Sequence, residues 1–250
     1  MKNNLDKDPS PYLQQHKNNP VSWQVWSKEI LDLAKKLKKP ILLSVGYASC
    51  HWCHVMAHES FEDKETAELM NKYFINIKVD REERPDIDFV FQNSYQIFNQ
   101  VSGGWPLTMF LDENGVPFMG GTYFPKISQH GLPSFKEVLK KIGSIYTEQR
   151  IEITKQSPLI IKNLELKKSS VVSQNLDSIL QILISNLDAD KGGYKGTPKF
   201  PIFNVYETLI YFYNKNKDSK LIKPIEIIVN KLCSQGIYDQ VEGGISRYAI

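Results

Sequence analysis

The 250 residues are enough for one large domain or two ordinary ones, and with 41% hydrophobic residues the chain can bury a core. A net charge of +3, from 31 basic and 28 acidic residues, is too balanced to predict a nucleic-acid partner. No apolar run approaches the length needed to cross a membrane, so we predict no membrane partner.

The three cysteines indicate the compartment. Residues 1–8 carry no apolar export region, and three cysteines are too few for a framework of structural disulfides. We therefore expect a cytoplasmic protein, in which a lone Cys-x-x-Cys pair is catalytic or metal-binding. Cys233 lies in an apolar helical stretch and is expected to be an inert core residue.

The chain begins with an arm, a helix and a strand. Residues 1–20 are polar and interrupted by prolines, and the apolar residues among them predict that this arm packs against the rest of the chain. Residues 21–38 place apolar side chains at steps of three and four, which predicts a helix that covers a sheet. Residues 41–45 form an apolar run after Pro40, which predicts a buried strand.

The central motif is Cys50-His51-Trp52-Cys53, which follows that strand after a short turn. Apolar residues at helical spacing continue to residue 70, so the motif lies where a strand passes into a helix, the setting of a redox-active dithiol. Residues three apart on a helix share one face, with Cα atoms about 5 Å apart, within reach of a disulfide. Free N–H groups and the helix dipole stabilise a thiolate at Cys50, and a protonated His51 adds to this effect. We predict Cys50 as the nucleophile and Cys53 as the resolving cysteine.

Two other chemistries use the same residues. Cys50-His-Trp-Cys53-His54 also matches the C-x-x-C-H pattern of covalent haem attachment, but haem proteins of this kind are usually exported and need no buried strand before the motif. Zinc is the second alternative, with four nearby candidate ligands: Cys50, Cys53, His54 and His58. A second cysteine pair is missing, so we predict neither a metal site nor a cofactor.

A second strand, a helix and a hairpin follow the motif. Residues 74–80 alternate in polarity as a strand, and residues 87–98 are predicted to be helical after a charged loop, Asp80 to Asp86. Two short strands within 107–121 are joined by Asn-Gly and predict a hairpin, and a helix at 133–146 completes this half. In this order the elements predict an α/β fold of the thioredoxin type, a central mixed sheet with flanking helices.

Pro106 lies immediately before the hairpin and follows two glycines and Trp105. A proline in this position is a candidate for a cis peptide bond, with an ordinary trans proline as the alternative. In a dithiol protein, a cis bond here would place the backbone of Trp105 beside the cysteines. There it can pair with an extended segment of a substrate.

Several segments between residues 10 and 125 carry a family resemblance. They are Ser10-Pro-Tyr-Leu-Gln-Gln-His16 with Asn19-Pro20, Tyr47-Ala-Ser-Cys50-His-Trp-Cys53-His-Val-Met56, Glu59-Ser-Phe-Glu-Asp63, Val79-Asp-Arg-Glu-Glu-Arg-Pro-Asp-Ile-Asp88, Gly103-Gly-Trp-Pro-Leu107 and Gly120-Gly-Thr-Tyr-Phe-Pro125. Through them the chain resembles the thioredoxin-like domain of the spermatogenesis-associated thioredoxin family. The resemblance implies a thioredoxin fold with Cys50 and Cys53 as the dithiol and Pro106 as the cis proline. It also implies that the arm around His16 and the Asp80 to Asp86 loop belong to the working surface, without assigning a role to either.

Two residues depart from the pattern of typical thioredoxins. Ser44 stands where those proteins carry a buried aspartate, six residues before the first cysteine, and Trp52 replaces the usual proline before the second cysteine. These departures leave the proton acceptor and the redox potential open. We expect four neighbours to support the two cysteines: His51, Trp52, Trp105 and Pro106.

The second half of the chain differs in composition. We predict a thioredoxin-like domain with its N-terminal arm at 1–150, a polar, lysine-rich connector at 151–173, and an all-α segment at 174–250. The last segment resembles the opening of the helical-hairpin toroid that follows the thioredoxin domain in this family. A few helices cannot close a ring, so we expect a truncated toroid that packs on the first domain or awaits a partner chain. No glycosidase or epimerase activity is expected.

The predicted function is that of a cytoplasmic thiol–disulfide oxidoreductase acting on a protein or small-molecule disulfide. The alternative is a binding or redox-sensing module without catalysis, which docks a partner protein or the missing part of the toroid. The sequence leaves open the substrate, the reductant and the oligomeric state.

Overall fold

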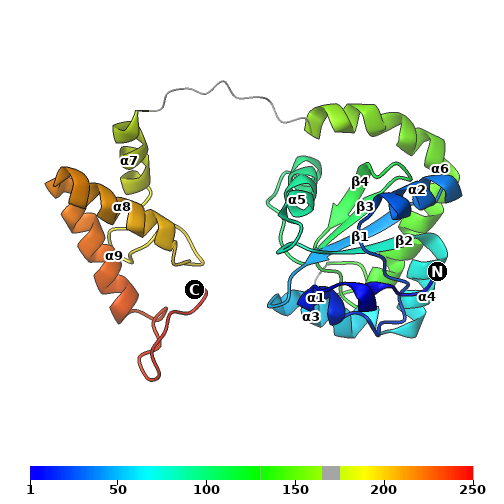
Figure 1. Cartoon of the computed structure of the whole chain (residues 1–250), viewed down its shortest axis with the longest axis horizontal. Helices are drawn as coiled ribbons and strands as arrows, with labels where there is room; N and C mark the ends of the chain where they lie inside the picture. Colours follow the sequence, from blue (N-terminus) through cyan, green and yellow to red (C-terminus); the bar gives the residue numbers. More distant parts are fainter. Residues whose placement is uncertain (130, 165–174, 250) are drawn as a thin grey trace. The chain divides into compact units, whose positions relative to one another are not determined.

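The computed structural model describes residues 1–129, 131–164 and 175–249. The chain divides into two compact units, Met1–Lys167 and Lys168–Ile250, and the described residues of each form a core of their own. The first unit contains the sheet and the cysteine motif, whereas the described elements of the second unit are helices and loops (Figure 1). The predicted domain boundaries at residues 150 and 174 stay predictions.

Within the described residues, the strands form one mixed sheet of four strands in the order β2-β1-β3-β4. The central strand β1 (Ile41–Gly46) runs parallel to β2 (Ile75–Asp80) and antiparallel to β3 (Leu107–Leu111). The edge strand β4 (Pro117–Gly121) pairs antiparallel with β3. Helices on both faces complete a thioredoxin-like fold, so the predicted fold class is confirmed (Figure 1).

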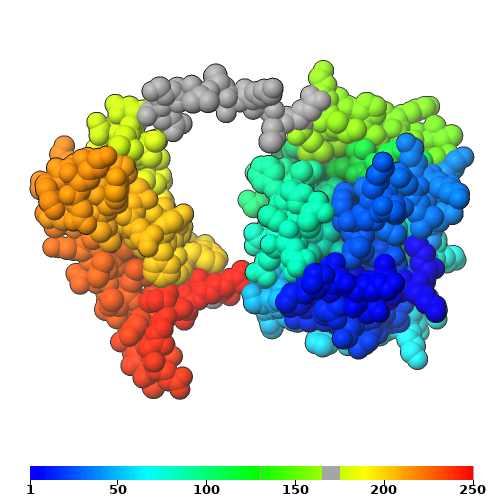
Figure 2. Space-filling view, in the orientation of Figure 1, coloured from blue at the N-terminus to red at the C-terminus, as the bar shows by residue number. Residues whose placement is uncertain are grey.

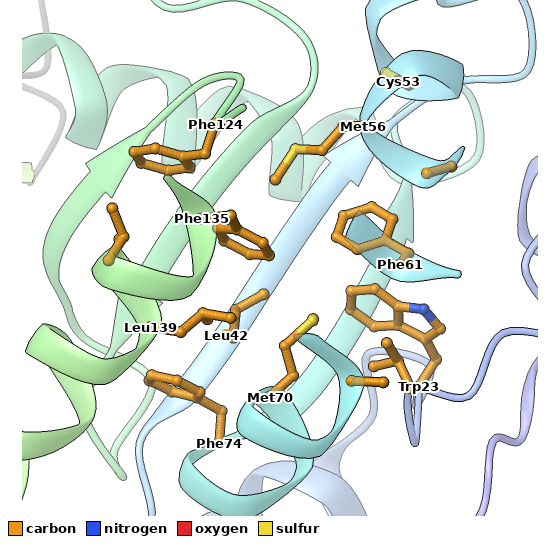
Figure 3. Packing of buried hydrophobic residues seen from close by; sticks show 14 of the residues in the cluster. Trp23, Leu42, Cys53, Met56, Phe61, Met70, Phe74, Phe124, Phe135 and Leu139 are labelled. Atoms are coloured by element: carbon orange, nitrogen blue, oxygen red, sulfur yellow. The ribbon is translucent and has the colours of Figure 1, made fainter. Parts of the chain in front are cut away.

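The helices of the first unit cover the two faces of this sheet. One face packs against α1, α3, α4 and α6, and the other against α2 and α5. Their bounds are α1 (Pro11–Gln14), α2 (Lys28–Leu37), α3 (His51–Met56), α4 (Lys64–Tyr73), α5 (Pro85–Asn99) and α6 (Phe135–Leu164), with a short 3-10 helix η1 (Leu5–Lys7) and a short π-helix η2 (Ala57–Phe61). Alternate residues of β1 enter opposite cores, because successive side chains of a strand point to opposite faces. Figure 3 shows the first core, in which Leu42 of β1 packs near Phe135 and Leu139 of α6.

The predicted helix at 21–38 is wrong in its first seven residues, since α2 begins at Lys28. The backbone of Gln24 instead pairs with β2: its N–H donates to Asn76 O at 2.9 Å, and its carbonyl accepts from Lys78 N at 3.0 Å. The apolar spacing was misleading because Trp23 and Trp26 pack into opposite cores. Burial against a sheet edge can produce the same spacing as a helix face.

Two further predicted helices have different bounds. The helix after the cysteines is interrupted between η2 and α4, because Asp63 caps a new helix by accepting the Thr66 N–H at 2.9 Å. The helix predicted at 133–146 continues as α6 to Leu164 and is bent at Gln149. The first part of the predicted connector is therefore the last part of α6.

The second unit contains α7 (Leu176–Ser185), α8 (Phe203–Asn216), the short η3 (Ser219–Leu221) and α9 (Ile222–Ser234). These helices enclose a small core: Leu180, Tyr206, Leu209, Leu221 and Ile228. The predicted helical character of this segment is confirmed, while its relation to a toroid stays a prediction. The expectation of a buried Cys233 is wrong, because that side chain is exposed on α9.

Candidate active site

The two cysteines of the motif lie where β1 passes into α3. Cys50 caps the helix and Cys53 lies in its first turn, with their Cα atoms 5.2 Å apart and their sulfurs joined in a disulfide. Cys50 Sγ accepts a hydrogen bond from the backbone N–H of Cys53 at 3.2 Å. The N–H groups at the start of a helix favour negative charge, so this contact is suited to a thiolate at Cys50.

The residues between the cysteines point outward. His51 is exposed, and its ring lies edge-on to Trp52 with 5.7 Å between the centroids. Trp52 is 53% exposed and rests on the ring of Tyr123, 5.1 Å away. Tyr123 donates a hydrogen bond to Glu59 Oε2 at 2.6 Å, and burial together with Glu59 raises the pKa of Tyr123 to about 12. A protonated tyrosine therefore supports an exposed aromatic side chain beside the dithiol.

The peptide bond between Trp105 and Pro106 is cis, and it precedes β3. The indole N–H of Trp105 donates to Asp88 Oδ1 at 2.8 Å, and the Arg81 guanidinium lies 4.1 Å from the centre of the Trp105 ring. Arg81 Nε in turn donates to Asp88 Oδ2 at 3.0 Å. These contacts connect the charged loop after β2 to the segment before β3. The loop thus has a structural role that the sequence alone did not assign.

A cavity of about 330 Å³ opens beside this segment. It is lined by aromatic rings and by the two glycines before Trp105: Trp52, Tyr95, Gly103, Gly104, Trp105 and Tyr123, with Ser102 and Thr122. Glycines leave the backbone accessible, and aromatic rings provide apolar contact area. The cavity therefore combines aromatic surface with accessible backbone and hydroxyl groups.

The neighbouring strands β1 and β2 carry buried polar residues, among them Ser44 and Lys78. Lys78 is 1% exposed, and its Nζ donates to Ser44 Oγ at 3.1 Å. The same Nζ lies over three aromatic rings, 4.6 to 4.9 Å from their centres: Tyr12, Trp23 and Phe61. Burial lowers the pKa of Lys78 well below its ordinary value. Sequence analysis missed this residue because alternation suggested an exposed face, whereas both faces of β2 are covered.

The N-terminal arm lies along the surface of the first unit (Figure 2). Its Tyr12 ring packs against the buried Lys78. His16 is buried, its Nδ1 is 2.9 Å from Asn19 Oδ1, and its ring lies edge-on to Tyr12. Burial, followed by the charge of Lys78, lowers the pKa of His16 to about 2. Ser10 Oγ donates to Asp80 Oδ2 at 2.7 Å, which connects the arm to the end of β2. His16 is thus a neutral packing residue within the arm.

The four candidate ligands of the zinc alternative have other partners. Cys50 and Cys53 form the disulfide, His54 Nε2 is 2.7 Å from the carbonyl of Ala48, and His58 Nδ1 is 3.0 Å from Glu62 Oε1. In the part of the chain that the structure describes, no three His, Cys, Asp or Glu side chains come together as a metal-ligand set. The helices of the described residues also include none with the length and apolarity to cross a membrane.

Comparison with known proteins identifies relatives for the whole chain. The chain is 36% identical to the uncharacterized protein B0495.5 of Caenorhabditis elegans over 257 aligned residues. This alignment covers 100% of this chain and 35% of the worm protein. Over 262 residues the chain is 35% identical to the human spermatogenesis-associated protein 20, covering 99% of this chain and 33% of that protein. The chain thus spans about a third of the length of these relatives.

A family model and a solved structure each match half of the chain or more. A DsbH oxidoreductase structure aligns with 50% of this chain and 83% of its own, at 20% identity and a TM-score of 0.36. The model of the Thioredox_DsbH family covers residues 2–165. The resemblance drawn from the sequence motifs is thereby confirmed. The chain belongs to the thioredoxin-like family described as "Protein of unknown function, DUF255".

Proposed function

We propose that this protein is a thiol–disulfide oxidoreductase in which Cys50 attacks the substrate and Cys53 resolves the intermediate. The observation that carries the proposal is the geometry of the pair. Cys50 caps α3 and accepts a backbone N–H through its sulfur, while Cys53 lies close enough to close a disulfide with it. A sulfur at a helix N-terminus ionises more readily, and the thiolate is the reactive form.

The reduction of a substrate proceeds in two exchange steps. The Cys50 thiolate attacks one sulfur of the substrate disulfide, a mixed disulfide forms, and the other substrate sulfur leaves as a thiolate. The Cys53 thiolate then attacks Cys50 Sγ, the bond between Cys50 and the substrate breaks, and the Cys50–Cys53 disulfide closes. Two electrons pass to the substrate, so an external dithiol must reduce the pair before the next cycle.

The surroundings of the dithiol favour a protein disulfide as the substrate. The two cysteines are 3% and 2% exposed in the disulfide form, whereas Trp52 between them in the sequence is 53% exposed and available for contact with a substrate. The aromatic cavity between Trp52 and Trp105 provides a place for a neighbouring apolar side chain of a peptide.

Single cysteine variants test the proposal. We expect the wild-type protein to accelerate the reduction of insulin by dithiothreitol, and Cys50→Ser to lower the rate to that of dithiothreitol alone. Cys53→Ser should instead trap a mixed disulfide, because the resolving thiol is absent. Cys233→Ser is the matched control, since it removes an exposed cysteine of the second unit and should leave the rate unchanged.

A wild-type rate equal to that of Cys50→Ser would contradict the proposal. It would favour the redox-sensing or binding module, an alternative that finds support in Ser44. That residue offers Lys78 a hydroxyl where typical thioredoxins have a carboxylate to accept a proton. A disulfide that forms reversibly without accelerating insulin reduction would indicate sensing.

A further inference from the structure

The hydroxyl of Tyr12 is a buried polar group without a partner. Tyr12 lies in α1, its side chain is 1% exposed, and its Oη makes no hydrogen bond. A buried hydroxyl that has given up its hydrogen bonds to water costs free energy, so native structures rarely contain one without a reason. The reason can lie in another state of the protein, in which the hydroxyl finds an acceptor.

That acceptor is close by, across Gly46 at the end of β1. A methyl group at position 46 would lie 2.2 Å from Tyr12 Oη and 2.8 Å from Cys53 Sγ. Both atoms thus occupy the space that a larger side chain would fill, and they can be no more than about 5 Å apart. Glycine is needed here so that a side chain of the arm can approach the resolving cysteine.

The groups around Tyr12 keep its hydroxyl protonated. Burial raises the pKa of Tyr12, and the negative charge of Asp80 raises it further. Lys78 lies over the face of the ring and His16 against its edge, while His54 and His58 influence His16 from α3 and η2. A tyrosine in this setting acts as a hydrogen-bond donor, and the group that benefits from a donor is an anion.

We propose that the Tyr12 hydroxyl donates a hydrogen bond to the Cys53 thiolate and thereby accelerates the resolving step. This inference rests on the proposed oxidoreductase function. In that step the Cys53 thiolate attacks Cys50 Sγ, the Cys50–Cys53 bond forms, and the substrate sulfur leaves with the electron pair. Cys53 gives its proton to water, and the departing thiolate takes one from water. Once the disulfide has closed, the negative charge is gone and the hydroxyl is left without a partner.

A hydrogen bond from Tyr12 would compensate for the missing carboxylate at Ser44. The hydroxyl of Ser44 already accepts from Lys78, and a serine cannot take up a proton as a carboxylate can. The arm supplies a different kind of help to the resolving thiol, by stabilising its thiolate instead of accepting its proton. Tyr12 is therefore a positioning and stabilising residue that is contributed from outside the α/β core.

The variant Tyr12→Phe isolates this contribution. It keeps the ring contacts to His16 and Lys78 and removes only a buried oxygen that makes no hydrogen bond, so we expect a melting temperature no lower than that of the wild type. With the prereduced protein and a peptide disulfide in single turnover, formation of the mixed disulfide should keep its wild-type rate. Its resolution should slow by about tenfold, in keeping with the loss of one charge-assisted hydrogen bond. The matched control is Tyr206→Phe, a buried tyrosine of the second unit.

The pH profile separates this role from a structural one. The resolving rate of Tyr12→Phe should rise towards the wild-type rate at high pH, where Cys53 ionises without help. As a second measurement, thiolate absorbance is followed in a protein that also carries Cys50→Ser and Cys233→Ser, so that only Cys53 contributes. Its ionisation should move to higher pH when Tyr12→Phe is added. A structural defect would instead lower the rates of both formation and resolution of the mixed disulfide at every pH.

The two proposals can fail separately. A wild-type resolving rate and an unshifted Cys53 ionisation in Tyr12→Phe would overturn the inference and leave the oxidoreductase function standing. Absence of any mixed disulfide, even in Cys53→Ser, would overturn the oxidoreductase function and the inference with it.

Discussion

At the scale of single residues, Lys78 stands out because an ordinarily charged side chain is buried in the interior. It is an amine in a buried layer, where it has one hydroxyl and three aromatic rings around it. Burial lowers the pKa of Lys78 in the folded protein. Between this lowered pKa and the ordinary pKa of the unfolded chain, Lys78 is neutral in the folded state and protonated in the unfolded state. Within that range the stability of the protein rises with pH.

We predict that Lys78→Met stabilises the protein near pH 7. Methionine has a similar length and no charge to desolvate, so the free energy of unfolding should rise by on the order of 1–3 kcal/mol. The gain should shrink as the pH rises towards about 10.4, the ordinary pKa of lysine, because the cost of deprotonation disappears there. Urea unfolding at pH 7 and pH 10 measures both effects. The exposed Lys35→Met is the control, and a loss of stability at pH 7 would contradict the prediction.

At the scale of elements, the start of α4 decides how the segment after the cysteines is arranged. Asp63 interrupts the helical run and caps α4 through the backbone N–H and the hydroxyl of Thr66, at 2.9 and 2.7 Å. Lys136 of α6 lies 3.1 Å from the same carboxylate. Burial alone would raise the pKa of Asp63, but these hydrogen bonds and the lysine charge outweigh it and hold the pKa well below its usual range. One carboxylate thus orders α4 and attaches it to α6.

Two substitutions of Asp63 separate capping from charge. Asp63→Asn keeps an acceptor for Thr66 and loses the charge, so we expect a loss of about 1 kcal/mol at pH 7. Asp63→Ala also loses the cap, which should raise the cost by about another 1 kcal/mol. Because the folded pKa is lowered, the charge contribution is present above the ordinary carboxyl pKa of about 3.9 and is lost as the pH falls below it. Thermal unfolding at pH 7 and pH 3 measures this, and an Asn variant equally destabilised at both pH values would refute it.

At the scale of the whole molecule, the first unit contains all the strands found among the described residues and every candidate site residue named above. Its two cores are built from residues before position 165, and the family model covers the same part of the chain, residues 2–165. We therefore propose that this unit folds and reacts without the second. The toroid relation of the second unit, its partner chain and the cytoplasmic location stay predictions.

A chain that ends after residue 164 tests this independence. All four tryptophans of the protein lie in the first unit, so their fluorescence reports the unfolding of that unit in both the full-length and the shortened chain. We expect the same urea midpoint and the same rate of insulin reduction for the two chains. Loss of a cooperative transition in the shortened chain would show that the second unit is required for the first to fold.

The sequence by itself determined the strands, the hairpin and the position of the cysteines at a helix start. These features depend on neighbours within a few residues, through apolar runs, turn residues and caps. The family motifs also indicated that the arm and the loop after β2 belong to the working surface of the domain. Neither local spacing nor motif length, however, could say what these segments contact.

Only the tertiary structure decided which residues surround the dithiol. The Tyr12 hydroxyl lies within about 5 Å of Cys53 Sγ beside Gly46, and Arg81 lies over the ring of Trp105, although each pair is separated by more than twenty residues in the chain. The burial of Lys78 and the extended path of residues 21–27 likewise depend on both faces of β2 and its edge being covered. Periodicity records that a side chain is buried or exposed on average, whereas contacts between distant segments are set by how whole elements pack.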